Sequence, residues 1–132
     1  MVRIEATYDG DLRCTATHGP SGMHLVTDAP VDNNGKGESF SPTDLLATSM
    51  LTCVMTIVAI RADSKGIDVD GMNGSVEKSM AANPRRIAKL EVIVDLPSNL
   101  SMDDRAWLIT EGCNCPVCVS VSESMEVDVT FL

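Results

Sequence analysis

Apolar and polar residues alternate near the start of the chain. Residues 2–8 alternate with a period of two, and the shorter segments 12–17 and 23–27 follow the same rule. The first segment has its larger apolar side chains on one face: Val2, Ile4, Ala6 and Tyr8. This period is typical of half-buried strands, and the glycine-containing segments between them are typical of turns. We therefore expect an antiparallel meander of three strands.

Residues 41–66 have a different pattern, which predicts a long helix. Ser41 suits the N-cap, Pro42 the first helical position and Gly66 the C-terminal end. Apolar side chains fall on nearly every face of this helix: Leu45, Leu46, Met50, Leu51, Val54, Met55, Ile57, Val58 and Ile60. A helix that is apolar all round is buried all round. Because a chain of 132 residues cannot easily cover it alone, we expect a partner subunit to supply part of the cover.

The rest of the chain completes one α+β domain over residues 1–132. The loop after the third strand has no periodicity, and the following elements are two strands, two helices and a closing strand. Their expected ranges are 67–80 and 86–97 for the strands, 102–112 and 116–123 for the helices, and 125–131 for the last strand. Ser101 is the expected N-cap of the first of these helices. The predicted order is βββ-α-ββ-αα-β.

Charge and composition narrow the range of possible functions and partners. The formal net charge is −9, which argues against nucleic acid and anionic lipid as partners. The N-terminus has no apolar signal region, and uninterrupted apolar runs are shorter than the roughly 20 residues that a bilayer requires. Five cysteines is an odd number without the spacing of a disulfide scaffold. We therefore expect a cytoplasmic protein with reduced thiols and no membrane partner.

Cys53 lies in the middle of the predicted central helix, beside a narrow polar stripe formed by Ser49, Thr52 and Thr56. It lies roughly 15 Å along the axis from Thr43, at about 1.5 Å per residue, so the dipole of its own helix cannot activate it. Burial alone would raise the pKa of a thiol. Cys53 is therefore either a small core residue or a reactive thiol with a cation, such as an arginine, nearby.

Three further cysteines, Cys113, Cys115 and Cys118, lie within six residues. Pro116 follows Cys115 and favours a helix start, which makes Cys115 a plausible N-cap whose thiolate meets free backbone N–H groups. A structural metal would require a fourth ligand from Cys53, Cys14, His18 or His24, and no second pair with zinc spacing exists. Cys115 and Cys118 could also form a local C-x-x-C dithiol. We expect no metal and no cofactor.

Two segments in this order resemble the OsmC/Ohr family. "SFSPTDLLATSMLTC" is similar to the family segment S-P-x-[DE]-L-L followed by a cysteine, and "CPVCVSV" is similar to its C-P-V segment before the last strand. The predicted element order also matches, so the resemblance covers nearly the whole chain. It implies an OsmC-like fold of two intertwined subunits, in which antiparallel sheets surround a long buried central helix.

The resemblance also implies a thiol-dependent reductase of organic hydroperoxides, with roles for particular residues. Cys53 would attack the peroxide and become a sulfenic acid, and Cys115 would resolve it as a disulfide, with Cys113 and Cys118 as bystanders. Arg13 would hold Cys53 as thiolate. The family's glutamate after the proline is Thr43 here, so Asp44 is the nearest acid.

The implied partners are a second copy of the chain, a small organic hydroperoxide and a dithiol reductant, either a lipoylated protein or one of the thioredoxin type. Because Thr43 replaces the glutamate, a second hypothesis is a non-enzymatic thiol sensor, or a protein that binds a small hydrophobic or sulfur-containing ligand. Asp44 also has an alternative role, which is to cap the central helix.

Overall fold

A computed structural model describes residues 1–132. The chain divides into two units, Met1–Leu46 and Ala47–Leu132. The first unit is an antiparallel sheet in the order β1-β2-β3, followed by a short 3-10 helix. Its elements are β1 (Ile4–Gly10), β2 (Arg13–His18), β3 (His24–Asp28) and η1 (Val31–Asn33). Asp11 and Leu12 both have positive φ, 52° and 62°, so Leu12 belongs to the β1–β2 turn rather than to the second strand.

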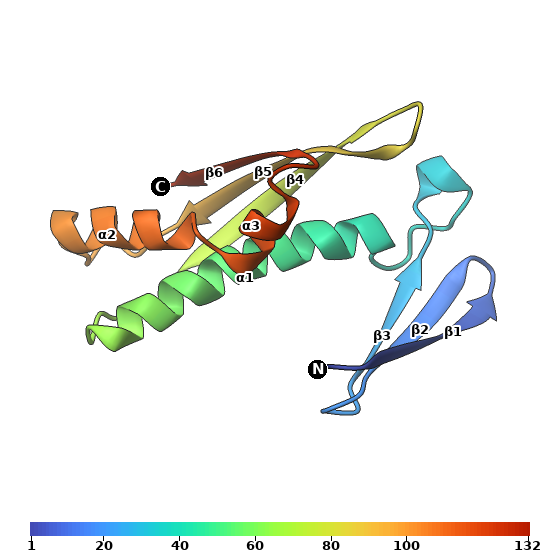
Figure 1. Ribbon diagram of the computed structural model, residues 1–132, viewed down its shortest axis with the longest axis horizontal. Helices are drawn as coiled ribbons and strands as arrows, with labels where there is room; N and C mark the ends of the chain where they lie inside the picture. Colours follow the sequence, from blue (N-terminus) through green and yellow to red (C-terminus); the bar gives the residue numbers. More distant parts are fainter. The chain divides into compact units, whose positions relative to one another are not determined.

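The second unit combines helices with a three-stranded sheet in the order β4-β5-β6. The strands are β4 (Asn73–Ala81), β5 (Arg86–Asp95) and β6 (Glu126–Phe131), and the helices are α1 (Pro42–Ser64), α2 (Met102–Gly112) and α3 (Pro116–Val121). Helix α1 begins in the first unit and runs along the sheet of the second, whose β5 and β6 are connected through α2 and α3 (Figure 1). The expected order βββ-α-ββ-αα-β and the α+β class are therefore confirmed.

One strand pairing differs from the expected antiparallel sheets. Strand β6 pairs with β5 in parallel, with Leu90 opposite Val127 and Val92 opposite Val129. A connection that contains two helices is long enough to return the chain to the same end of the sheet, which parallel pairing requires. The second sheet is therefore mixed, whereas β4 and β5 pair antiparallel as expected.

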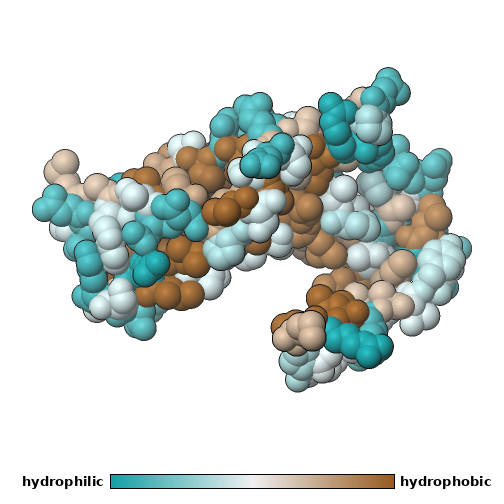
Figure 2. Space-filling model, viewed as in Figure 1, coloured by the Kyte–Doolittle hydropathy of each residue, from teal (hydrophilic) through white to brown (hydrophobic).

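Helix α1 buries one stripe of its surface. Its buried residues recur every three or four positions: Ala47, Met50, Val54, Val58 and Ala62. The side chains of Ser49, Thr52, Thr56 and Ile60 are exposed, and Figure 2 shows apolar residues at the surface of the second unit beside this helix. The expectation of a helix buried all round is therefore wrong for the single chain, because one sheet covers only one side of a helix.

By length and composition alone, α1 could also cross a membrane. Its mean hydropathy over 18 residues is 1.8, and 28% of that window is buried. The expectation from the sequence rested only on uninterrupted apolar runs, and the window that meets this test also contains polar residues. It is weak evidence for a membrane helix, because the central helix of a soluble fold has the same composition.

A close approach at Gly112 fixes the segment that leads to the cysteine cluster. A Cβ atom at Gly112 would lie 2.8 Å from both Val58 Cγ2 and Phe131 Cζ. The end of α2 therefore packs directly on α1 and β6, and a larger residue here would require the side chains of Val58 and Phe131 to shift. Because Cys113 follows at once and α3 begins at Pro116, this packing holds the three clustered cysteines beside α1.

Candidate functional site

Cys53 is a free, half-buried thiol in the middle of α1. It lies at the border between the buried stripe, which includes Met50 and Val54, and the exposed polar positions. The hydroxyl of Thr52 donates a hydrogen bond of 2.8 Å to the carbonyl oxygen of Thr48 on the same helix. The hydroxyl of this polar neighbour is therefore already bonded to the helix backbone.

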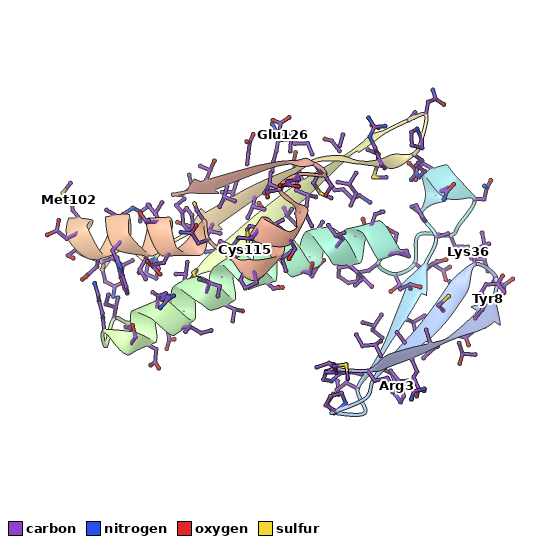
Figure 3. The ribbon with its side chains drawn as sticks, viewed as in Figure 1. Arg3, Tyr8, Lys36, Met102, Cys115 and Glu126 are labelled. Atoms are coloured by element: carbon purple, nitrogen blue, oxygen red, sulfur yellow. A yellow bond between two sulfur atoms is a disulfide. The ribbon has the colours of Figure 1, made fainter.

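Cys115 is the N-cap of α3, as the sequence predicts. Its backbone is extended, with φ −64° and ψ 143°, and its Sγ accepts a hydrogen bond of 3.0 Å from the backbone N–H of Cys118. Cys115 is fully buried. Figure 3 shows it at the start of α3, close to α1.

Cys115 and Cys118 form a disulfide, with their Cα atoms 5.1 Å apart. The first turn of a helix brings residues three apart onto the same side, within the Cα separation that a disulfide requires. The local C-x-x-C pairing that the sequence left open is therefore present, and Cys118 has Cys115 as its disulfide partner. A Cys53–Cys115 disulfide stays a prediction, for a state other than this one.

The disulfide borders both α1 and a cavity. Cys118 Sγ lies 3.2 Å from Met50 Sδ, a residue that is fully buried on α1. Cys118 also lines a cavity of about 320 Å³, together with Cys113, Val119, Ser122, Val127 and Val129. Cys113 is a free and exposed thiol. The described residues contain no group of three or more His, Cys, Asp or Glu side chains arranged to hold a metal ion.

Arg13, the predicted activating cation, lies in the first unit and binds two carboxylates. Its guanidinium contacts Asp28 Oδ2 at 3.3 Å and also pairs with Glu38. Asp28 is fully buried, and its Oδ2 accepts a hydrogen bond of 2.9 Å from the backbone N–H of Glu38. This N–H bond first, and the positive charge of Arg13 next, hold the pKa of Asp28 below its usual value. The sequence missed both acidic partners, because neither belongs to a motif.

Asp44 lies in the first turn of α1 and takes part in capping its N-terminal end. Its carboxylate accepts a hydrogen bond of 2.9 Å from the backbone N–H of Ser41, and its own backbone N–H donates one of 3.1 Å to Ser41 Oγ. This reciprocal pair is the capping-box arrangement. The structure thus shows the capping role that the sequence analysis offered as the alternative, and a catalytic role for Asp44 stays a prediction.

The lowered pKa of Asp28 predicts a pH-dependent contribution to stability. A carboxyl whose pKa is lower in the folded state stabilises that state above its unfolded pKa of about 3.9, and the contribution is lost as the pH falls through the folded value. We expect Asp28→Asn to lower the urea midpoint at pH 7, and the difference from the unsubstituted protein to shrink at pH 3. Asp11→Asn, at an exposed turn of the same unit, is the matched control. An equal difference at both pH values would contradict this account.

The fold and these side chains define a small α+β protein with a free thiol on its central helix and a disulfide at the start of a short one. The family model for OsmC-like proteins matches residues 35–130, and the chain belongs to that family. No curated protein matches the sequence.

Several solved structures share the fold. One is a Psychrobacter arcticus 273-4 protein named for osmotic stress induction and a detoxification response. Its sequence is 40% identical to this one, and its structure matches with a TM-score of 0.93. The match covers 100% of this chain and 96% of that protein. An organic hydroperoxide resistance protein of Legionella pneumophila is 15% identical with a TM-score of 0.79, covering 99% and 96%. One from Elizabethkingia anophelis is 15% identical with a TM-score of 0.78, covering 99% and 94%.

Proposed function

We propose that this protein is a cysteine-based peroxidase that reduces organic hydroperoxides. The observation that carries the proposal is a free, half-buried Cys53 in the middle of α1, in a chain of the OsmC-like family. The Cys53 thiolate attacks the terminal peroxide oxygen, the O–O bond breaks, and the alkoxide leaves as an alcohol after taking up a proton. Cys53 is left as a sulfenic acid, which the Cys115 thiol converts to a Cys53–Cys115 disulfide with loss of water.

Activation of Cys53 requires a positive charge, which we assign to Arg13. A nearby opposite charge lowers a thiol pKa by roughly 1–3 units and so raises the thiolate fraction at neutral pH. Asp28 and Glu38 hold the guanidinium in place within its own unit. Asp44 is the acid nearest to the position of the family glutamate, and its catalytic role is part of this proposal, beside the helix cap that its carboxylate forms.

The surroundings of Cys53 favour an alkyl peroxide over hydrogen peroxide. Leu46, Met50 and Met55 lie within two turns of it on α1, and apolar side chains stabilise an organic substituent that hydrogen peroxide lacks. The proposed partners are a second copy of the chain and a dithiol reductant, lipoylated or of the thioredoxin type. Nucleic acid and membranes are not proposed partners, and the proposed location is the cytoplasm.

The test is the dithiothreitol-dependent loss of cumene hydroperoxide. We expect Cys53→Ser to lower the rate on the order of 1,000-fold or more, because it removes the attacking nucleophile. Cys14→Ser is the matched control, since Cys14 is the other free, half-buried thiol of the chain, and it should leave the rate unchanged. We also expect hydrogen peroxide to be consumed more slowly than cumene hydroperoxide. Equal rates for the unsubstituted and Cys53→Ser proteins would exclude the peroxidase.

One observation favours the alternative function, a thiol sensor or small-ligand binding protein. In this structure Cys115 is bonded to Cys118 and is not free to resolve Cys53. A protein of this kind would form an adduct at Cys53 once per chain without turnover. Under that function, peroxide loss would stop after one equivalent even with excess dithiothreitol, whereas the peroxidase continues.

A further inference from the structure

The three clustered cysteines differ in how accessible they are to solvent. Cys115 is 0% exposed, whereas Cys118 is 8% exposed and lines the cavity of about 320 Å³. Cys113 is exposed and lines the same cavity. A disulfide that involves Cys115 is therefore closed to an external thiol at the Cys115 sulfur, but it can be approached through Cys118.

Contacts through α1 place this disulfide near Cys53. Cys118 Sγ lies 3.2 Å from Met50 Sδ, and Met50 and Cys53 are three residues apart on the same helix. Residues at this spacing are neighbours on a helix surface, with Cβ atoms about 5–6 Å apart. Cys118 therefore packs against the helical turn that leads to Cys53.

We propose that Cys115 and Cys118 are a second redox couple, which takes the oxidising equivalent from Cys53 and presents it to a dithiol reductant in the cavity beside Cys118. This inference rests on the proposed peroxidase function. It assigns a function to Cys118 and to the cavity.

The transfer is a thiol–disulfide exchange without net oxidation. After Cys53 and Cys115 have formed their disulfide, the Cys118 thiolate attacks Cys115 Sγ. The Cys53–Cys115 bond breaks, the Cys115–Cys118 bond forms, and Cys53 leaves as a thiolate ready for another peroxide. The proton lost by Cys118 passes to solvent. The product is the disulfide that this structure contains.

The cavity beside Cys118 is the place where an external dithiol reduces the Cys115–Cys118 disulfide. A thiolate of the external dithiol attacks Cys118 Sγ, and Cys115 leaves as a thiolate. The backbone N–H of Cys118 already donates to the Cys115 sulfur, and a hydrogen bond to the charged form makes Cys115 a better leaving group. The second thiol of the reductant breaks the mixed disulfide and leaves as a cyclic disulfide, with both cysteines reduced. Three valines in the lining, Val119, Val127 and Val129, suit a dithiol on an apolar chain.

The first test uses the unsubstituted protein. The fully reduced protein receives one equivalent of cumene hydroperoxide, is quenched with acid at increasing times, and is digested for disulfide mapping by mass spectrometry. We expect Cys53–Cys115 peptides to appear first and to be replaced by the Cys115–Cys118 peptide. A Cys53–Cys115 disulfide that persists as the final product would overturn the relay.

The second test compares Cys118→Ser with Cys14→Ser, which changes a free, half-buried thiol of the first unit. We expect Cys118→Ser to release one equivalent of cumyl alcohol at the normal rate, to accumulate Cys53–Cys115, and to turn over at least tenfold more slowly with dithiothreitol. Cys14→Ser should turn over normally. Unchanged turnover in Cys118→Ser overturns the relay but leaves the peroxidase standing, whereas loss of peroxide at the same rate in Cys53→Ser overturns the peroxidase itself.

Discussion

Replacing Cys115 by serine is expected to stop dithiol-driven turnover and to leave a sulfenic acid on Cys53. Serine keeps the size and the N-cap hydrogen bond of this position but cannot form a disulfide, so the oxidised Cys53 has lost its resolving partner. With one equivalent of cumene hydroperoxide, we expect dimedone to label Cys53 in nearly every chain, and peptide mass spectrometry locates the label. Steady-state turnover should fall on the order of 100-fold or more, because the second covalent step is lost.

The matched control for this variant is Cys113→Ser, which changes an exposed, free thiol two residues away. In that protein Cys115 is intact, so dimedone should label Cys53 only weakly. Strong label on Cys113 or Cys118 in the Cys115→Ser protein, with Cys53 unlabelled, would contradict the division of roles between Cys53 and Cys115.

Assembly into a dimer is the second large expected effect. Large apolar side chains are exposed on both units, among them Ile4, Tyr8 and Leu25 on the first unit and Ile60, Ile93 and Val119 on the second. Single chains rarely leave so many apolar side chains in water unless they associate. Light scattering at micromolar concentration should therefore give about twice the 14.1 kDa chain mass, and a well-folded monomer would contradict the proposed assembly.

A charge on the exposed side of α1 should weaken this dimer. Ile60 is 57% exposed in the single chain, and an unpaired charge buried there on association costs about 3 kcal/mol, which is roughly 100-fold in the dissociation constant. We expect Ile60→Glu to shift the mass toward one chain on dilution. Ser64→Glu adds the same charge at the exposed end of α1 and serves as the control. An unchanged mass for Ile60→Glu would place the interface elsewhere.

Local signals in the sequence were sufficient to predict the order of elements. The Ser101 side chain accepts from the backbone N–H of Asp104, and Cys115 caps α3 as expected. Caps and turns of this kind depend on residues within four positions of each other, so they can be predicted without knowing the tertiary structure. For the same reason, the start of α1 at Pro42 was predicted correctly.

Features that depend on distant contacts could not be predicted in the same way. The parallel pairing of β6 with β5 is set by how the helices between them cross the sheet. The exposed side of α1 could not be identified from the sequence, because apolar residues occur on nearly every face of this helix. The acidic partners of Arg13 lie 15 and 25 residues further along the chain, and nothing in their local sequence connects them to an arginine.

The cysteine cluster shows what a family resemblance leaves out. Carrying the family pattern onto Cys53 and Cys115 left Cys118 without a function, although its spacing from Cys115 already allowed a local disulfide. Cys115 cannot belong to both disulfides at once, so the pairing observed here and the pairing that the resemblance implies belong to different states, which the proposed relay makes successive. The order in which the two disulfides form therefore tests the proposed relay.

The most direct measurement is the oxidation of Cys115 and Cys118 in a Cys53→Ser protein. The fully reduced variant receives limiting cumene hydroperoxide, and the Cys115–Cys118 disulfide is quantified against time by alkylation and mass spectrometry, beside Cys14→Ser as the control. The account predicts that the pair stays reduced in Cys53→Ser and becomes oxidised at the normal rate in Cys14→Ser. Formation of the disulfide at an undiminished rate without Cys53 would show that the C-P-V-C dithiol reacts with the peroxide itself, and would contradict the account.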